Sequence, residues 1–258
     1  MNIKLNLTLT NFLSFVYLIF LFQLNGFAQD PVSIKKALIA VVHLSSTADE
    51  FKFLYELEEN KAVGSIKNMT KKHYDKIIIL EKSEATYAKF RSNLIDLLVD
   101  QDITTVDTIM YIHGKGTNYI KGPSLCFYQD FDCTSMEEIK SDLVQTFQEI
   151  NYFINGGSFP IQNKLRAIYS DACYGNSHSQ TWVDIAFEVA SGSIAKDSNK
   201  SIDLHSFLNS WLNNGKTFAE AIKSANGHMF SDISDFWIKN ANSHKMIVGD
   251  GEITFKLP

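Results

Sequence analysis

The sequence lacks the short motifs that mark several large enzyme classes. It contains no Gly-x-Ser-x-Gly segment of the kind that presents a nucleophilic serine, no His-Glu-x-x-His zinc motif and neither of the common glycine-rich phosphate loops. The segment Gly114-Lys115-Gly116-Thr117 has part of a phosphate-loop pattern, but the upstream glycine is missing at the required spacing. We therefore do not expect a serine hydrolase of that type, a zinc peptidase or a nucleotide-phosphate site.

The chain also lacks an excess of basic residues. It has 24 Lys and Arg against 29 Asp and Glu, which gives a formal net charge of −5 in 258 residues. Acidic and basic residues are mixed along the chain, and this distribution does not favour a nucleic-acid surface. Internal repeats and long low-complexity linkers are absent too, so we expect a single folded domain.

Cysteine is scarce, with only Cys126, Cys133 and Cys173. An odd number leaves at least one cysteine outside any intramolecular bridge. Cys126 and Cys133 are close in sequence and could form a disulfide across a loop. The alternative is that all three are reduced and act as small apolar residues, since spacing alone does not establish disulfide geometry.

The first 28 residues have the organisation of a secretory signal peptide. Lys4 is their only charge, residues 12–22 are almost wholly apolar, and Gly26-Phe27-Ala28 places small residues at alternate positions. We predict cleavage after Ala28, which would leave residues 29–258 as a secreted or periplasmic domain without a membrane segment. The apolar run is short for a membrane span of ~20 residues, and an uncleaved anchor is the alternative.

Beyond this segment the chain alternates strand and helix patterns. Continuous apolar runs at 37–42 and 77–80 are typical of strands buried on both faces. Helical spacing of apolar residues predicts helices at 49–59, 84–100 and 180–191 and two more across 204–225, which meet at a break at Asn213-Asn214-Gly215. A capping box predicts another helix that begins at Thr134 or Ser135. This alternation favours an α/β fold with a mostly parallel central sheet and helices on both faces.

Two further apolar runs each lead into a reactive side chain. Residues 108–114 end in His113-Gly114, and residues 167–175 contain Asp171-Ala172-Cys173. If both strands are parallel, these side chains reach the carboxyl edge of one sheet, where sites form in open α/β folds. The pairing suggests a cysteine nucleophile with a histidine partner.

These two motifs resemble those of the caspase, gingipain, legumain and clostripain group of cysteine peptidases. In that group a strand ending in His-Gly precedes a strand ending in an acidic or small residue and Ala-Cys, the reverse of the order in papain-like enzymes. Asp171-Ala172-Cys173 is closest to the clostripain-like form, and residues 207–225 and 246–250 are similar to the end of related domains. The resemblance implies a caspase-like three-layer sandwich, endopeptidase activity on protein or peptide substrates and no cofactor.

The chemistry assigns a role to each residue. Cys173 would attack as a thiolate, and His113 would act as general acid toward the leaving amine. The backbone N–H groups of Gly114 and Cys173 would bind the oxyanion. By resemblance Asp171 would contact Arg or Lys at the cleaved position, although it could instead cap local backbone groups.

Other assignments remain open. His178 could be a second base or a polar loop residue. The acidic residues Asp130, Asp132, Glu137 and Glu138 could bind Ca²⁺, but they lack the central glycine of an EF-hand loop and are better explained as a solvated, helix-capping cluster. Two alternatives to a peptidase are a catalytically silent binding module of the same fold and a Cys-dependent hydrolase of small esters or amides.

Overall fold

A mixed sheet with the strand order β2-β1-β3-β6-β7-β8 forms the centre of the fold. The strands pair in parallel except β8, which is antiparallel to β7. A short extension, β4 and β5, pairs antiparallel with the end of β3. The strands are β1 (Lys35–His43), β2 (Lys76–Glu81), β3 (Ile103–Lys115), β4 (Ser124–Cys126), β5 (Thr134–Ser135), β6 (Leu165–Ser170), β7 (Val189–Ser193) and β8 (Lys245–Gly249).

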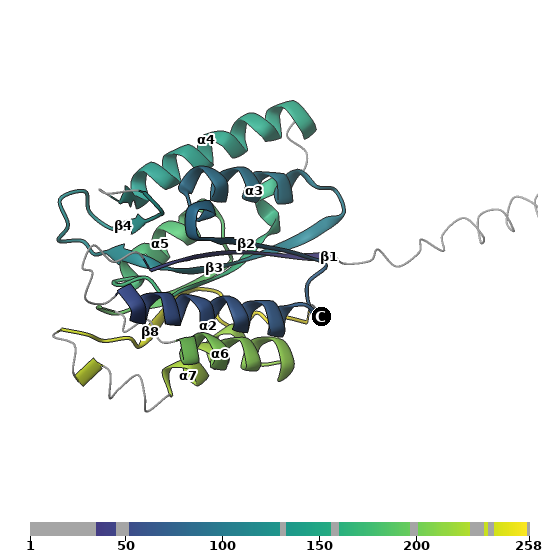
Figure 1. Ribbon diagram of the computed structural model, residues 1–258. Coiled ribbons are helices and arrows are strands. Elements are labelled where there is room, and N and C mark those ends of the chain that lie inside the picture. Colours follow the sequence, from purple (N-terminus) through teal and green to yellow (C-terminus); the bar gives the residue numbers. More distant parts are fainter. Residues whose placement is uncertain are drawn as a thin grey trace, which may run out of the picture. The chain divides into compact units, whose positions relative to one another are not determined.

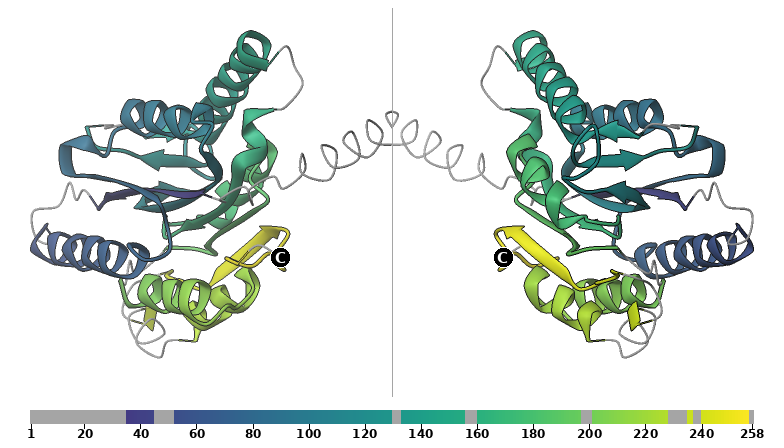
Figure 2. Two further views of the ribbon diagram at one scale, coloured as in Figure 1. Left: turned by 90° about the vertical axis from the view of Figure 1, so that its right-hand side faces the viewer. Right: turned by 90° about the vertical axis from the view of Figure 1, so that its left-hand side faces the viewer.

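Helices cover both faces of this sheet, as Figures 1 and 2 show. One apolar core lies between the sheet and α3, α4 and α5, and a second lies between the sheet and α2, α6 and α7. The helices are α2 (Lys52–Thr70), α3 (Tyr87–Val99), α4 (Met136–Asn155), α5 (Asn176–Ile185), α6 (Ser201–Leu208) and α7 (Phe218–Asn226). The predicted three-layer α/β sandwich with a mostly parallel sheet is confirmed.

The computed structural model describes residues 35–44, 52–129, 133–155, 160–196, 201–227, 235–236 and 240–256. The predicted signal peptide at residues 1–28 lies outside them, as do Asp130 and Asp132 of the acidic cluster. Within the described residues, every helix is too short or too polar to cross a membrane.

Local sequence explains where the main helices begin. Thr86 caps α3 by accepting a hydrogen bond from the Lys89 N–H. At α4 the capping box forms in the second of the two predicted registers, where the Ser135 N–H donates to the Glu138 carboxylate and the Glu138 N–H donates to the Ser135 hydroxyl. These bonds satisfy donors that a helix start otherwise leaves without partners.

One predicted helix was wrong in its second half. The sequence pattern predicted a helix over 180–191, whereas α5 ends at Ile185 and residues 189–193 form β7. Ala186 has a left-handed φ of 114°, which stops the helix, and β7 is buried along its whole length. A fully buried strand shows no alternation of polar and apolar residues, so periodicity alone did not separate it from the helix.

Candidate active site

The two predicted reactive segments lie at the same edge of the sheet. β3 and β6 are parallel neighbours, and Met110 of β3 is in register with Ser170 of β6. His113 and Cys173 each follow that pair by three residues, and the Asp171 N–H donates to the Met110 carbonyl at 2.8 Å. The structure therefore brings both motifs together, as the sequence predicted.

Gly114 is the point of closest approach between the two motifs. A Cβ atom placed on Gly114 would lie 2.6 Å from the Cys173 carbonyl oxygen and 3.0 Å from the Ala172 Cβ. Any side chain at this position would therefore push β3 away from the cysteine segment. Glycine allows the backbone that follows His113 to pack directly on the backbone of Cys173.

His113 is half-buried near the end of β3, and the Tyr55 ring packs edge-on against it. The two ring centroids are 5.1 Å apart, and the ring planes are nearly perpendicular. Burial lowers the pKa of His113 to about 4, and the charges of His43 and Lys115 act in the same direction. The imidazole is therefore neutral at neutral pH, and it can accept a proton before it donates one.

Cys173 is half-buried and is not part of the disulfide. The residues beside it are held by hydrogen bonds to residues at the end of β7 and just after it. The Ala172 carbonyl accepts a hydrogen bond from the Ser193 hydroxyl at 2.6 Å, and the Tyr174 N–H donates to the Ala195 carbonyl at 2.6 Å. Tyr174 has a left-handed φ of 57°, a conformation that is uncommon for a non-glycine residue and clusters at functional sites.

A second pair of glycines lets the helix that follows Cys173 pack tightly on the sheet. A Cβ placed on Gly192 would lie 2.1 Å from the Gly175 carbonyl carbon, and one on Gly175 would lie 2.8 Å from the Gly192 Cα. The backbone of α5's first turn therefore rests on β7 without intervening side chains. This contact holds the helix start immediately after the proposed nucleophile.

Sequence reasoning missed three residues of α2 and β1 that surround His113. Tyr55 contacts the His113 ring, and burial raises the pKa of the Tyr55 hydroxyl, with a further rise from the charge of Cys173. Glu59, one helical turn later, lies 3.6 Å from the Nδ1 of His43. The sequence could have identified His43, because an apolar strand pattern leads directly into it, as another leads into His113. No comparable local signal identified Tyr55 or Glu59.

Asp171 does not have the environment predicted for a substrate-binding acid. It is fully buried, and its Oδ1 lies 2.6 Å from Nζ of Lys245, which is also buried. The Tyr169 hydroxyl donates to the same carboxylate oxygen at 3.2 Å. Because the carboxylate has no exposed surface and already contacts a cation from β8, the expected contact with a substrate's Arg or Lys is not supported.

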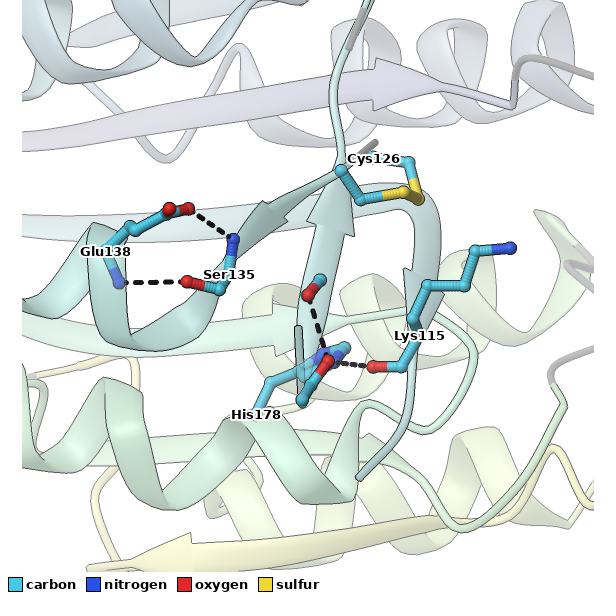
Figure 3. The surroundings of a disulfide bond; sticks show 8 residues. Lys115, Cys126, Ser135, Glu138 and His178 are labelled. Carbon is cyan, nitrogen blue, oxygen red and sulfur yellow. Dashed lines mark hydrogen bonds between the residues drawn. A yellow bond between two sulfur atoms is a disulfide. The ribbon is translucent and has the colours of Figure 1, made fainter. Parts of the chain in front are cut away.

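Cys126 and Cys133 form a disulfide, so the bridged alternative is confirmed. Cys126 pairs directly with His113 in the antiparallel ladder between β3 and β4. The disulfide and the Ser135–Glu138 capping box lie on the same short extension of the sheet (Figure 3). Together they connect the strand that carries His113 to the start of α4.

Within the described part of the chain, no group of three or more His, Cys, Asp or Glu side chains is placed to hold a metal ion. Glu138 of the acidic cluster is used in the α4 capping box. The remaining chemistry of the site consists of a thiol, an imidazole, a tyrosine hydroxyl and backbone amides. These groups are suited to acyl transfer through a thioester.

No family model and no curated protein matches this chain. Among solved structures, it is similar to the crystal structure of the Drosophila initiator caspase Dronc, with a TM-score of 0.49 and 9% sequence identity. The match covers 85% of this chain and 81% of that chain. At this level of similarity, what the site can do follows from its own residues.

Proposed function

We propose that this protein is an exported cysteine peptidase in which Cys173 is the nucleophile and His113 moves the proton. The observation that supports this most strongly is the contact of Gly114 with the Cys173 carbonyl. It fixes the segment after the histidine against the nucleophile segment at the carboxyl edge of adjacent parallel strands. Neither residue type alone would support the proposal, because isolated cysteines and histidines at strand ends are common structural residues.

Burial lowers the pKa of His113 to about 4, so the imidazole is neutral before the reaction begins. A neutral imidazole accepts the proton of the Cys173 thiol as sulfur attacks the substrate carbonyl and the C–S bond forms. The oxyanion of the tetrahedral intermediate would be bound by the backbone N–H groups of Gly114 and Cys173. In this scheme His113 is first a base, and it becomes the predicted general acid only after that transfer.

The second half of the reaction returns both groups to their starting state. The C–N bond breaks, and the amine leaves with the proton held by His113, so that an acyl thioester remains on Cys173. Water then attacks the thioester while His113 accepts its proton, and the C–S bond breaks. The products are an amine and a carboxylic acid, and Cys173 regains its proton.

The substrate class is proposed to be protein or peptide. Preference for a basic residue at the cleaved bond is not included, because Asp171 is paired with Lys245 inside the protein. A library of fluorogenic peptides varied at the cleaved position tests this directly. Cleavage mainly after Arg or Lys would show that Asp171, or another acidic residue, contacts the side chain at the cleaved position.

Export is proposed from the first 28 residues alone. Expression of the full chain in a bacterium with a periplasm, followed by amino-terminal sequencing of the exported protein, should give Gln29 as the first residue. A product that retains the apolar run and remains with the membrane fraction would contradict cleavage after Ala28.

The catalytic assignment is tested with a peptide that carries an electrophile and a fluorophore. The wild-type protein should be labelled at Cys173 and should cleave the matching peptide amide, whereas Cys173→Ala should do neither. His113→Ala should reduce kcat by a factor of at least ~10². His73→Ala is a matched control, since the half-buried His73 precedes the start of β2, away from the carboxyl edge of the sheet, and contacts Asn213.

The outcomes separate the peptidase from its alternatives. Turnover of small esters without turnover of peptide amides would indicate a small ester or amide hydrolase. Absence of both turnover and labelling in correctly folded, reduced protein would indicate a binding module. Peptide cleavage that survives in Cys173→Ala would refute the assignment of the nucleophile.

A further inference from the structure

His178 connects the helix after the nucleophile to the strand of the catalytic histidine. It lies in the first turn of α5, is fully buried, and its Nε2 is 2.8 Å from the Lys115 carbonyl oxygen (Figure 3). A carbonyl oxygen can only accept a hydrogen bond, so Nε2 carries the proton. Because burial lowers the pKa of His178 to about 4, the ring is neutral at neutral pH and Nδ1 is unprotonated.

The same ring also packs against Gly114. A Cβ on Gly114 would lie 2.7 Å from the His178 Cε1, almost as close as it would lie to the Cys173 carbonyl oxygen. The His178 ring and the Cys173 carbonyl therefore both lie close against the side of Gly114 where a Cβ would project. One side chain thus fixes the backbone of two consecutive residues, Gly114 by contact and Lys115 by a hydrogen bond.

This arrangement excludes the second-base role considered from the sequence. The Nε2–H donates a hydrogen bond to the Lys115 carbonyl. Nδ1 is buried and has no hydrogen-bond partner among the described residues. His178 is fully buried, so neither substrate nor water reaches its Nδ1. The contacts of His178 are with the backbone of the site.

We propose that His178 is a positioning residue that orients the Gly114 N–H toward the carbonyl oxygen attacked by Cys173. The inference rests on the proposed function. An oxyanion donor is effective only when it points at the position that the developing negative charge will occupy. Gly114 has no side chain with which to fix its own orientation, so the neighbouring contacts must do so. His178 supplies one of them from the element that directly follows the nucleophile.

Two near-isosteric substitutions separate the hydrogen bond from simple packing. His178→Gln keeps an amide donor that can reach the Lys115 carbonyl, and His178→Met fills similar space without a donor. We expect His178→Met to lower kcat for peptide cleavage about 10²-fold with little change in KM, in line with the loss of one oriented oxyanion donor. His178→Gln should recover most of that loss.

A second readout distinguishes orientation of the oxyanion donor from damage to the nucleophile. A peptide aldehyde forms a hemithioacetal whose oxygen occupies the oxyanion position, whereas iodoacetamide alkylates the thiol without forming an oxyanion. His178→Met should weaken aldehyde binding in parallel with kcat and leave the alkylation rate of Cys173 within about twofold of wild type. Equal kcat values for the Met and Gln variants, or equal losses in aldehyde binding and alkylation, would overturn the proposal.

Folding and the proposed function are controlled separately. If His178→Met does not fold, His178→Asn replaces it, since its shorter amide does not reach the Lys115 carbonyl, and the comparison with Gln is unchanged. If the wild-type protein neither cleaves peptides nor binds the aldehyde through Cys173, the proposed function fails, and this inference fails with it. An active wild-type enzyme with fully active Met and Asn variants would refute the role of His178 alone.

Discussion

Lys245 and Asp171 form a buried ion pair between the last strand of the sheet and the segment that leads to Cys173, with 2.6 Å between Nζ and Oδ1. Their side chains are 1% and 0% exposed, so solvent does not screen the pair. The Lys245 Nζ also lies over the Tyr169 ring, 5.3 Å from its centroid. The antiparallel β8 thus places a buried cation against Asp171, two residues before Cys173.

Breaking this pair should destabilise the protein more than removing both charges. Lys245→Met leaves a buried carboxylate without its cation, and we expect the free energy of unfolding to fall by ~3–5 kcal/mol. The double variant Lys245→Met, Asp171→Asn should recover much of that loss, because neither charge then remains buried. Urea unfolding of the two single variants and the double variant measures the coupling. Additive losses would contradict a direct interaction between the two groups.

His113 should titrate far below an ordinary histidine. In a proton NMR titration its ring resonance should have a midpoint near pH 4, since burial lowers its pKa to about 4. In the free enzyme, kcat/KM should fall as the pH decreases through that midpoint, because protonated His113 cannot accept the thiol proton.

Two variants show which histidine gives each titration midpoint. His178 also has a pKa of about 4, so two low midpoints are expected, and His178→Gln should remove one of them. His113→Asn should remove the other. A midpoint for His113 well above pH 7 would mean that the resting site holds an imidazolium, and the order of proton transfers proposed above would be reversed.

The disulfide should stabilise the strand that carries His113. Cys126 pairs with His113 across β3 and β4, and the bridge closes a loop with a sequence separation of seven residues. We expect the double variant Cys126→Ser, Cys133→Ser to lose about 2–3 kcal/mol of stability, by the loop-entropy relation. Hydrogen exchange should increase first at β4. Unchanged exchange there, with a loss of stability elsewhere, would show that the bridge does not support β3.

Much of the architecture was predictable because its signals are local. The apolar runs of β1, β2, β3 and β6 are bounded by polar residues and turns, and the capping box at Ser135 and Glu138 lies within four residues. The reactive segments were found for the same reason. Each places its polar side chain directly after a strand, and parallel pairing brings strand ends to one edge.

The remaining contacts join residues that are distant in sequence, and no local sequence pattern predicts such contacts. The resemblance implied that Asp171 contacts a substrate, with capping of local backbone groups as the alternative, and the sequence around Asp171 does not show that Lys245, from the last strand, lies against it. Tyr55 belongs to a helix whose apolar face is imperfect, and its contact with His113 depends on how α2 packs on the sheet. His178 was left open as a second base or a polar loop residue, whereas it lies in the first turn of α5, whose start has no side-chain cap to mark it in the sequence.

Gly114 should tolerate no side chain, for reasons of space alone. Gly114→Ala would place a methyl group 2.6 Å from the Cys173 carbonyl oxygen and 2.7 Å from the His178 ring, so backbone atoms must move apart. We expect a loss of ~1–3 kcal/mol in stability, which is typical of overpacking, and a fall in kcat of at least tenfold. Gly64→Ala is the matched control, because a Cβ there meets no atom within 4 Å and alanine favours its helix by ~0.5–1 kcal/mol. Urea unfolding and peptide turnover of both variants test this. A Gly114→Ala variant with wild-type stability and turnover would show that the backbones of the two motifs are not held in contact in solution, and the site would then require a different arrangement to bring His113 to Cys173.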